Sequence, residues 1–272
     1  MDSSKNNATG RHIMITGGSQ GLGLAMTRAF IERGARVTAI ARGVEGLDRA
    51  REAGATIIAG DATDAELMTR AVSAGQPDVL ILNAGARLAS KPIDEQTWEE
   101  YSAIWNTDVK AGLAGTQAAL YVPMRPGSRV LLMSSGAAMV LSVPYIEPAS
   151  LWLSGGYVGA KRMVWYMAHQ ANAVSRKRGL GVEFQVLVPA QLMPGTPLGH
   201  AVAAAYARYE GTTAEEHVLR RYGSILDPEH FGKMVAELVG DARYESGVAY
   251  GFRADAGIMP LDVPVQPLSK SS

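Results

Sequence analysis

The sequence contains no cysteine among its 272 residues. This absence excludes a disulfide scaffold, a thiolate nucleophile and any metal site with cysteine ligands. Neither sign of charge is in excess, because Lys plus Arg and Asp plus Glu each number 26. Binding to nucleic acid requires a local excess of basic residues that neutralise phosphates, so we expect no nucleic-acid partner.

Long hydrophobic runs are also missing. No stretch reaches the roughly 18 consecutive apolar residues that suggest a membrane-spanning helix. The first residues, Met1 to Asn7, are polar and lack the apolar segment of a secretory signal. We therefore expect a cytoplasmic protein with no membrane partner. The histidines show no metal-ligand spacing such as H-E-x-x-H, so we expect no metal site.

Short apolar runs alternate with longer amphipathic segments along most of the chain. Hydrophobic residues make up 47% of the sequence, which is ample for a buried core. The runs that indicate strands are 12–16, 36–41, 56–59, 78–82, 129–133, 182–188 and 248–250. This alternation predicts an α/β fold: a single doubly wound Rossmann-type domain, with a mostly parallel seven-stranded sheet and helices on both faces.

Domain boundaries follow from the composition of the two ends. We expect one domain over residues 11–263, with a flexible tail at 1–10 and another at 264–272, because both ends are polar or rich in Pro and Ser. In a doubly wound sheet, the ligand crevice lies at the carboxyl ends of the strands. Motifs directly after strands are therefore the candidates for function.

A glycine-rich turn follows the first expected strand, over residues 16–23, and precedes a helix. Glycines at such a turn allow backbone N–H groups to approach a pyrophosphate at the positive end of the helix. The alternative is a glycine-rich turn without a ligand. The candidate cofactor-binding residues of this turn are Gly17, Ser19, Gln20, Gly21, Leu22 and Gly23.

Several later motifs come in a definite order between the expected elements. They are Asp61-Ala62, Asn83-Ala84-Gly85, Ser134-Ser135-Gly136 and Tyr157-x-x-x-Lys161. With the Thr-Gly-x-x-x-Gly-x-Gly turn, they resemble the short-chain dehydrogenase/reductase family over roughly residues 11 to 258. The resemblance implies an NAD(P)-dependent oxidoreductase that transfers hydride between nicotinamide and a carbonyl/hydroxyl substrate. It also implies that Asp61, Ala62, Asn83, Ala84 and Gly85 bind the cofactor.

The residue after the second expected strand bears on the choice of dinucleotide. A carboxylate there binds the ribose 2′-hydroxyl of NAD, whereas a cation accommodates the 2′-phosphate of NADP. Ala41 stands where NAD-preferring relatives carry Asp, and Arg42 follows it. A guanidinium holds a phosphate by two parallel hydrogen bonds, so the sequence favours NADP(H), with NAD(H) as the alternative. The other interpretation of Arg42 is a solvated surface residue.

Tyr157 and Lys161 are four residues apart, which places both on one face of a helix. A free tyrosine titrates near pH ~10, and a neighbouring ammonium favours its ionised form. The resemblance implies that Tyr157 is the general acid/base and that Ser135 binds the substrate oxygen. It also implies that Lys161 binds the nicotinamide ribose, and that Tyr157 contacts the cofactor as well.

Two features depart from the family pattern. Ser135 and Tyr157 are 22 positions apart, a longer interval than the family has, and the added residues lie within 139–156. We expect this segment, including Tyr145, Leu151 and Trp152, to form an apolar wall of the substrate pocket, so that the substrate is bulky and apolar. The alternative is a segment packed on the surface or at a subunit contact.

The second departure concerns the family's catalytic asparagine. Alignment through Gln117 places Asp108 at that position, with Asn106 two residues earlier. A carboxylate near Lys161 would stabilise the ammonium but oppose ionisation of Tyr157. Either Asp108 replaces the amide or Asn106 serves in its place. The sequence favours Asp108.

The resemblance continues after the sixth expected strand, where it implies cofactor contacts from Pro189, Leu192 and Thr196. Residues 198–222 form a helical stretch that we expect to cover the substrate. The resemblance also implies a homodimer or homotetramer. A non-redox enzyme, such as a dehydratase or epimerase, and an NADP-sensing regulator remain alternative functions on the same fold.

Overall fold

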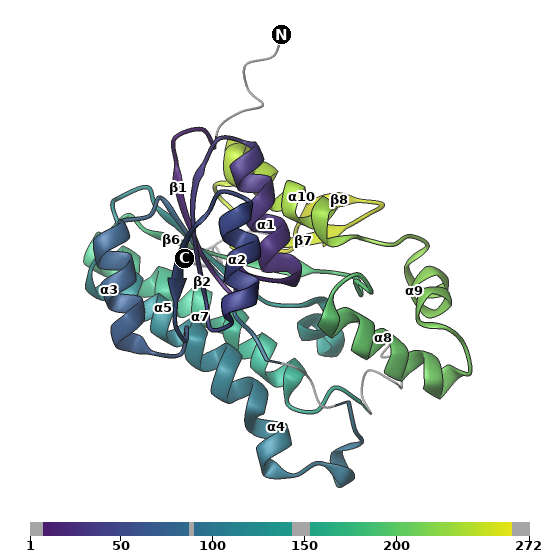
Figure 1. The fold of residues 1–272 in the computed structure, drawn as a ribbon. Coiled ribbons are helices and arrows are strands. Elements are labelled where there is room, and N and C mark those ends of the chain that lie inside the picture. The colour runs from purple at the N-terminus through teal and green to yellow at the C-terminus, as the bar shows by residue number, and fades with distance from the viewer. Residues whose placement is uncertain (1–7, 87–89, 143–152, 263–272) are drawn as a thin grey trace, which may run out of the picture.

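The computed structural model describes residues 8–86, 90–142 and 153–262. Within them, one sheet has the strand order β3-β2-β1-β4-β5-β6-β7-β8. All neighbouring strands are parallel except β7 and β8, which are antiparallel. The fold is therefore the expected doubly wound α/β domain (Figure 1). The strands are β1 (His12–Thr16), β2 (Arg36–Ala41), β3 (Thr56–Ala59), β4 (Val79–Leu82), β5 (Arg129–Met133), β6 (Glu183–Pro189), β7 (Ala249–Arg253) and β8 (Gly257–Pro260).

The last strand corrects the expected number of seven. β8 follows a turn at Asp255–Ala256 and pairs back onto β7, with Phe252 opposite Ile258. Its four residues are at most partly buried and end in a proline, so they lack the fully buried apolar run of the central strands β1, β4 and β5. Pairing with β8 also explains why β7 continues to Arg253, beyond its expected end at residue 250.

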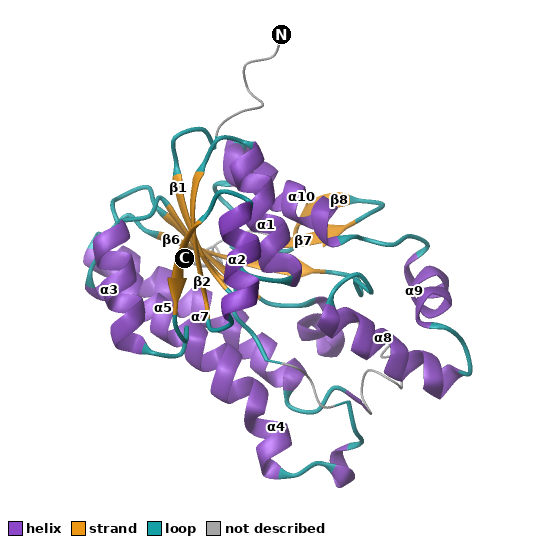
Figure 2. Cartoon of the chain, viewed as in Figure 1, coloured by secondary structure: helices purple, strands orange, loops and turns teal. Residues whose placement is uncertain are grey.

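Helices cover both faces of the sheet, as Figure 2 shows around the orange strands. Side chains alternate between the faces along each strand. In β1, Ile13 and Ile15 join the core with the first group of helices, whereas Met14 joins the core on the other face. The first group consists of α1 (Gly21–Glu32), α2 (Val44–Glu52) and α10 (Pro228–Gly240). The second consists of α3 (Ala65–Gly75), α5 (Lys110–Tyr121) and α7 (Tyr157–Arg178).

Further helices extend beyond these two layers. α4 (Trp98–Ile104) continues through a π-helical turn, η3 (Trp105–Val109), into α5. α8 (Pro197–Glu210) and α9 (Ala214–Tyr222) stand to one side of the sheet (Figure 1). Short 3-10 turns are η2 (Ile93–Glu95), η4 (Gly136–Ser142) and η5 (Ala242–Tyr244). Residues of η3, η4, α8 and α9 reach the carboxyl ends of the strands, where the expected crevice lies, whereas η5 accepts a hydrogen bond from Arg129 at the amino end of β5.

Ordered packing begins before residue 11, inside the segment expected to be a tail. Ala8 is fully buried in the core, and the backbone N–H of Gly10 donates to Gly34 O over 3.1 Å. No helix within the described residues is both long and apolar enough to cross a membrane.

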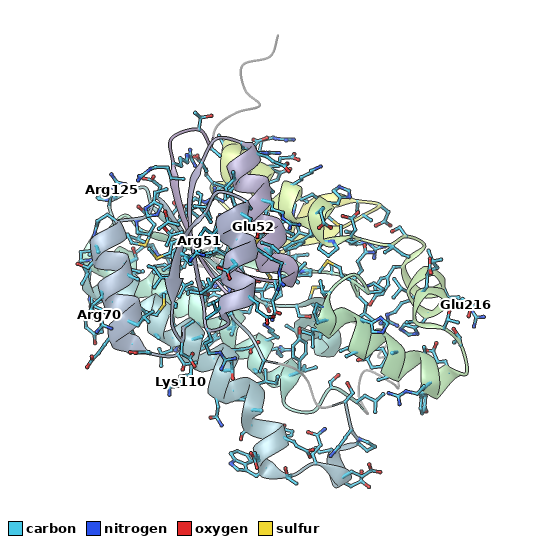
Figure 3. The ribbon with its side chains drawn as sticks, in the orientation of Figure 1. Arg51, Glu52, Arg70, Lys110, Arg125 and Glu216 are labelled. Carbon is cyan, nitrogen blue, oxygen red and sulfur yellow. The ribbon has the colours of Figure 1, made fainter. Side chains whose placement is uncertain are left out.

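Charged side chains lie mostly on the outside of the molecule. Arg70, Arg125 and Glu216 are examples that project from the ribbon in Figure 3. Charged groups are rarely buried unless they are paired. The two buried charges described below therefore call for a structural reason.

Candidate active site

The glycine-rich turn joins β1 to α1 through backbone conformations that other residues rarely adopt. Gly17 has φ +67° and Gly21 has φ +50°, both in the left-handed region. A Cβ on Gly23 would lie 1.9 Å from Gly17 O, so only glycine fits where α1 meets the turn. Gly23 is the one expected cofactor residue that does not line the cavity described below. It instead allows the helix to approach the turn closely.

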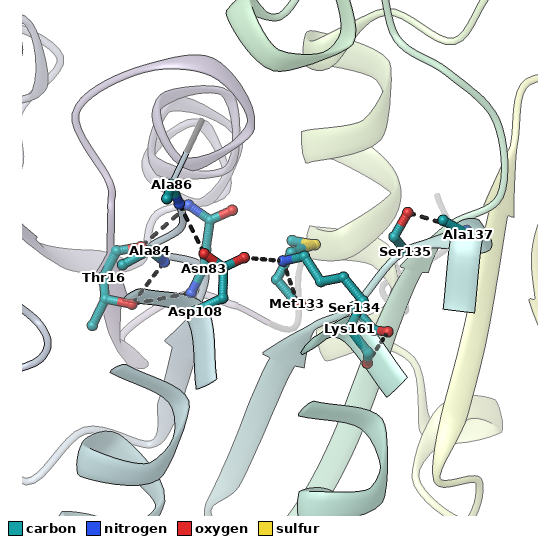
Figure 4. Close-up of polar contacts among 10 residues, drawn as sticks. All are labelled: Thr16, Asn83, Ala84, Ala86, Asp108, Met133, Ser134, Ser135, Ala137 and Lys161. Carbon is teal, nitrogen blue, oxygen red and sulfur yellow. Dashed lines mark hydrogen bonds and ion pairs between the residues drawn. The ribbon is translucent and has the colours of Figure 1, made fainter. Parts of the chain in front are cut away.

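Thr16 ties this turn to the end of β4. Its hydroxyl accepts hydrogen bonds from the backbone N–H groups of Asn83 and Ala84, over 3.0 and 3.1 Å (Figure 4). The Asn83 amide donates in return to the carbonyls of Thr16 and Gly17. These contacts hold the two strand ends that flank the centre of the crevice. They also give Asn83 a positioning role for the glycine-rich turn.

A cavity of about 910 Å³ runs along the carboxyl ends of the strands. This is the place where open α/β sheets bind their ligands. Every expected site residue except Gly23 lines it. They are Gly17, Ser19, Gln20, Gly21, Leu22, Arg42, Asp61, Ala62, Asn83, Ala84, Gly85, Asp108, Ser135, Tyr157, Lys161, Pro189, Leu192 and Thr196.

Lys161 and Asp108 form a buried ion pair at the middle of this cavity. Lys161 Nζ lies 2.7 Å from Asp108 Oδ2, and their side chains are only 7% and 3% exposed. Lys161 Nζ also donates to Met133 O over 3.1 Å, and Asp108 Oδ1 accepts from Ala86 N over 2.8 Å (Figure 4). Each charge is thus held by its partner and by one backbone group.

The environment of Lys161 keeps it charged. Burial lowers the pKa of its ammonium, but the charges of Asp108 and Tyr157 and the hydrogen bond to Asp108 outweigh this effect. The pKa of Lys161 therefore lies above its ordinary value. A permanent positive charge stands beside Tyr157, whose ring centroid is 5.6 Å from Lys161 Nζ.

Asp108 and Asn106 face different surroundings, although both belong to the π-helical turn η3. Residues two apart along a helical turn lie on nearly opposite sides of its axis, so the two side chains point almost oppositely. Asn106 is exposed, and its amide donates to Ser102 Oγ over 3.4 Å. The structure thus brings Asp108, and not Asn106, to Lys161.

The two serines after β5 also differ in their contacts. Ser134 is buried, and its hydroxyl donates to Lys161 O over 2.9 Å. Ser135 is half-buried, lines the cavity and accepts a hydrogen bond from Ala137 N over 3.2 Å. Ser134 therefore ties β5 to α7, whereas Ser135 presents its hydroxyl where a ligand can meet it. Tyr157 lines the same part of the cavity at the first turn of α7.

Arg42 and Asp61 lie at the opposite end of the cavity, after β2 and β3. Their closest charged atoms are 3.6 Å apart, and the side chains are 69% and 42% exposed. A hydrogen bond from Thr63 N lowers the pKa of Asp61, and the Arg42 guanidinium adds to the effect. Arg49 of α2 also lines this end. Sequence reasoning missed Arg49, although it lies on the helix directly after Arg42.

The segment after β6 brings Thr196 to the cavity. The Thr196 hydroxyl caps α8, because it accepts from Gly199 N over 2.9 Å and donates to Met193 O over 3.1 Å. Its Cβ also lies near the glycine-rich turn, 3.9 Å from where a Cβ on Gly21 would stand. Thr196 thus places the start of α8 next to the glycine-rich turn.

Part of the cavity wall comes from the stretch 198–222, which the sequence predicts as a helical cover without marking individual residues. Val202 and Tyr206 of α8, and Arg221 and Tyr222 at the end of α9, line it. No motif marks these residues, because α8 and α9 reach the cavity only through the fold. Of the segment 139–156, Met139 and Ser154 line the cavity, whereas Tyr145, Leu151 and Trp152 lie outside the described residues.

Comparison with known proteins agrees with this geometry. The family model of the short chain dehydrogenases matches residues 11–150. The chain belongs to the short chain dehydrogenase family. It is therefore an oxidoreductase that acts on a CH–OH/C=O pair, and the family implies a nicotinamide dinucleotide cofactor, NAD or NADP.

Individual relatives extend over most of this short chain dehydrogenase. It is 28% identical over 240 residues to the oxidoreductase asL5 of Sarocladium schorii, covering 85% of this chain and 88% of that protein. It is 24% identical over 277 residues to the L-fucose dehydrogenase of Rattus norvegicus, covering 95% and 97%. The crystal structure of levodione reductase has the same fold, with a TM-score of 0.72 at 19% identity over 89% of this chain and 95% of that one.

The described residues fit a dinucleotide. Gly17 and Gly21 have positive φ, and Gly23 makes a close approach, so three positions of the turn at the start of α1 carry no side chain. Backbone N–H groups at such a helix start bind a pyrophosphate. The cavity then continues from Arg42 and Asp61 to Lys161 and Tyr157, which places polar groups at both ends of an elongated ligand.

Proposed function

We propose that this protein is an NADPH-preferring reductase of ketones, with Tyr157 as the proton donor. The observation that carries the proposal is the arrangement of Ser135, Tyr157 and Lys161 around one cavity, with Lys161 held charged by Asp108. A bound nicotinamide dinucleotide supplies the hydride for reduction, or accepts it in the reverse direction. The protein supplies the proton and the contacts that orient the carbonyl group.

In this proposal, Ser135 donates a hydrogen bond to the substrate carbonyl and directs its oxygen toward Tyr157. Tyr157 gives its hydroxyl proton to that oxygen as the alcohol forms. The Lys161 ammonium favours the phenolate that remains. Lys161 also holds the ribose next to the nicotinamide, as the family resemblance implies.

Asp108 acts on the site through Lys161. Its carboxylate lies 2.7 Å from Lys161 Nζ and supplies the counter-charge that allows the ammonium to stay buried beside the Tyr157 ring. The ion pair therefore supports the role of Lys161 as a fixed cation next to the proton donor.

Arg42 supports the preference for NADPH. Its guanidinium is exposed at the end of β2, and its partner Asp61 is a half-exposed residue at 3.6 Å, so a phosphate dianion can compete for it. Arg49 lines the same end of the cavity and adds a second positive charge. Glu45 and Asp61 are the described acidic residues there, and they are the groups that would favour NAD instead.

The walls of the cavity beyond Tyr157 support a bulky, largely apolar carbonyl substrate. Leu192, Leu198, Val202 and Tyr206 belong to one hydrophobic cluster, and all of them line the cavity. Burying apolar ligand surface against them contributes roughly 25 cal/mol per Å². A small polar substrate would leave this surface unfilled.

Substitution of Tyr157 by Phe tests the function. It removes the proton donor and little packing, so we expect no measurable oxidation of NADPH with ketones of varied size, while NADPH binding measured by fluorescence is nearly unchanged. Lys161→Ala should reduce both turnover and binding. A Tyr157→Phe enzyme that kept most of its redox activity would argue for a dehydratase, an epimerase or a nucleotide sensor.

Homo-oligomers are a further part of the proposal. Large hydrophobic side chains are exposed on α4, η3 and α7: Trp98 is 77%, Trp105 39% and Tyr166 59% exposed. Apolar patches of this kind mark association surfaces. We expect light scattering at micromolar concentration to give the mass of a dimer or tetramer, and a monomer there would contradict this part of the proposal.

A further inference from the structure

The end of α9 lies at the rim of the cavity, although the helix stands apart from the sheet in Figure 1. α9 packs against α8, and a hydrogen bond of 2.8 Å between His217 Nδ1 and Glu210 Oε2 joins the two helices. Val202 and Tyr206 of α8 form a hydrophobic cluster that is separate from the two cores beside the sheet. The place of this helix pair therefore depends on contacts at its ends.

Gln191 fastens the segment after α9 to the carboxyl ends of two strands. It stands two residues after β6 and is 5% exposed. Its amide nitrogen donates to Ser224 O over 2.9 Å, and its amide oxygen accepts from Ala254 N over 2.8 Å. Ser224 comes two residues after α9, and Ala254 comes directly after β7. One side chain thus joins three segments that are far apart in the sequence.

Arg253, the last residue of β7, adds a longer contact between the same segments. It donates to Tyr222 O over 3.5 Å, while the carboxylate of Asp255 holds its guanidinium at 2.8 Å. Ala254, whose N–H donates to Gln191, lies between these two residues in the chain. Gln191 therefore also fixes the turn from which Arg253 reaches the end of α9.

An apolar anchor after α9 holds the chain but does not fix its direction. Leu226, two residues after Ser224, is fully buried in the core beside α1 and α10. Apolar contact is non-directional, whereas a hydrogen bond favours one distance and one angle. Without the Gln191 amide, the chain would stay attached through Leu226, and the end of α9 would have more freedom to shift.

Gln191 lines the cavity, but its amide is occupied by the backbone on both sides. A buried amide that gave up these partners would carry the cost of its desolvation. The side chain is therefore suited to hold the wall rather than to bind a substrate. The wall it holds includes Leu192 and Val202, which share a hydrophobic cluster, and Tyr222 at the end of α9.

We propose that Gln191 is a positioning residue for substrate binding. It holds the end of α9 against the carboxyl ends of β6 and β7, and so keeps Val202 and Tyr222 in place around the body of the substrate, away from the reacting carbonyl. The proposal rests on the proposed reductase function and names a residue that determines which substrates bind well. Its consequence is a KM that depends on Gln191 for bulky ketones and not for small ones.

Gln191→Met tests this role, because methionine conserves most of the volume and has no amide. With NADPH, the KM for the bulky ketone 2-acetylnaphthalene should rise by roughly fivefold or more, the effect of about one lost hydrogen bond. The kcat for that ketone, and the KM for the small ketone cyclohexanone, should change by less than about twofold. An equal rise in KM for both ketones would overturn the proposal.

Hydrogen exchange measures the same contact without a substrate. In Gln191→Met, peptides from residues 214–224 should exchange faster by roughly fivefold or more, while peptides from α1 keep their native rates. Gln191→Glu keeps an oxygen that accepts from Ala254 N but loses the donor to Ser224 O. Its exchange should rise over residues 214–224 and stay native over 249–257. Native exchange over 214–224 in Gln191→Met would show that Gln191 does not fix the end of α9.

Asn172→Ala is the matched control for a general loss of stability. Asn172 is another buried amide that is bound on both sides to the backbone, because it donates to Phe184 O over 2.7 Å and accepts from Phe184 N over 2.9 Å. It belongs to α7 and lies outside the residues that line the cavity. Its loss should lower the urea midpoint at least as much as Gln191→Met, and leave both KM values and the exchange of 214–224 unchanged. The same changes in both variants would overturn the positioning role.

The outcomes also separate this proposal from the proposed function. If ketones are reduced but Gln191→Met keeps the native KM for the bulky ketone, the positioning role is wrong while the reductase function stands. If no ketone oxidises NADPH, the reductase function is wrong, and hydrogen exchange decides by itself whether Gln191 fixes the end of α9. NADPH affinity, measured by fluorescence, should be the same in native and Gln191→Met protein. A loss of NADPH affinity as large as the rise in KM would assign Gln191 to the cofactor site and overturn its role in substrate binding.

Discussion

The two ion pairs in the cavity are made of the same kinds of groups in opposite surroundings. Lys161 and Asp108 lie 2.7 Å apart with 7% and 3% of their side chains exposed, whereas Arg42 and Asp61 lie 3.6 Å apart with 69% and 42% exposed. A buried pair cannot lose one member without leaving an uncompensated charge, whereas an exposed pair exchanges partners with water and ligands. The buried pair therefore suits a site where the charge of Lys161 must stay in one place. The exposed pair suits recognition of a ligand phosphate, because Arg42 can exchange Asp61 for another anion.

The two pairs should differ most in how much the loss of the aspartate lowers the free energy of unfolding. Asp108→Ala leaves the Lys161 ammonium buried without its counter-charge, which costs about 3–5 kcal/mol for a pair of this kind. Asp61→Ala, the matched change in the exposed pair, should cost no more than ~1 kcal/mol. Urea unfolding of both variants checks this, and equal losses would show that burial does not distinguish the pairs.

Arg42→Asp should weaken NADPH binding by more than tenfold and leave NADH binding similar or improved. The lost charge-assisted contact is worth ~1.5–3 kcal/mol, which is enough for that effect. Fluorescence titration with both cofactors measures it, and Arg70→Asp on α3 is a control at an exposed arginine that does not line the cavity. Native protein that binds NADPH and NADH equally well would contradict the assignment of Arg42.

The smallest expected effect concerns the pH profile. Asp108→Asn keeps a hydrogen-bond acceptor beside Lys161 but removes the charge that partly cancels the ammonium. The full ammonium charge then favours the Tyr157 phenolate, the form that accepts the proton of the alcohol, so the acidic limb of the pH profile, along which the rate of alcohol oxidation rises, should move to lower pH. Asp61→Asn should leave that limb unchanged. Rates measured from pH 6 to 10 check this prediction, and an upward displacement would refute it.

The substrate half of the cavity contrasts with the cofactor half in how far the sequence revealed it. Residues of the cofactor half stand next to glycines or at strand ends, where local patterns mark them, and all but Gly23 line the cavity. For the substrate half, the sequence predicts a covering helical stretch at 198–222 but marks none of its residues. Tyr206 and Arg221 line the cavity through the fold, in which Gln191 donates to Ser224 O just after α9. Their positions depend on contacts between distant parts of the chain.

The features that the sequence determined by itself are those that depend on the periodicity of helices and strands. The alternation of apolar runs with helical spacing implied a parallel α/β sheet, and four-residue spacing placed Tyr157 and Lys161 on one helix face. Such features are set by backbone periods that act within a few residues.

Tertiary structure decided the features that join distant residues. The choice of Asp108 over Asn106 depended on which side of a π-helical turn faces α7, and β8 became a strand only by pairing with β7. Likewise, the family resemblance implies Ser135 as the serine that binds the substrate, and the contact of the Ser134 hydroxyl with Lys161 O gives the two serines different surroundings. Packing and strand order bring these groups together. Both depend on residues that are far apart in the sequence, so no local pattern predicts them.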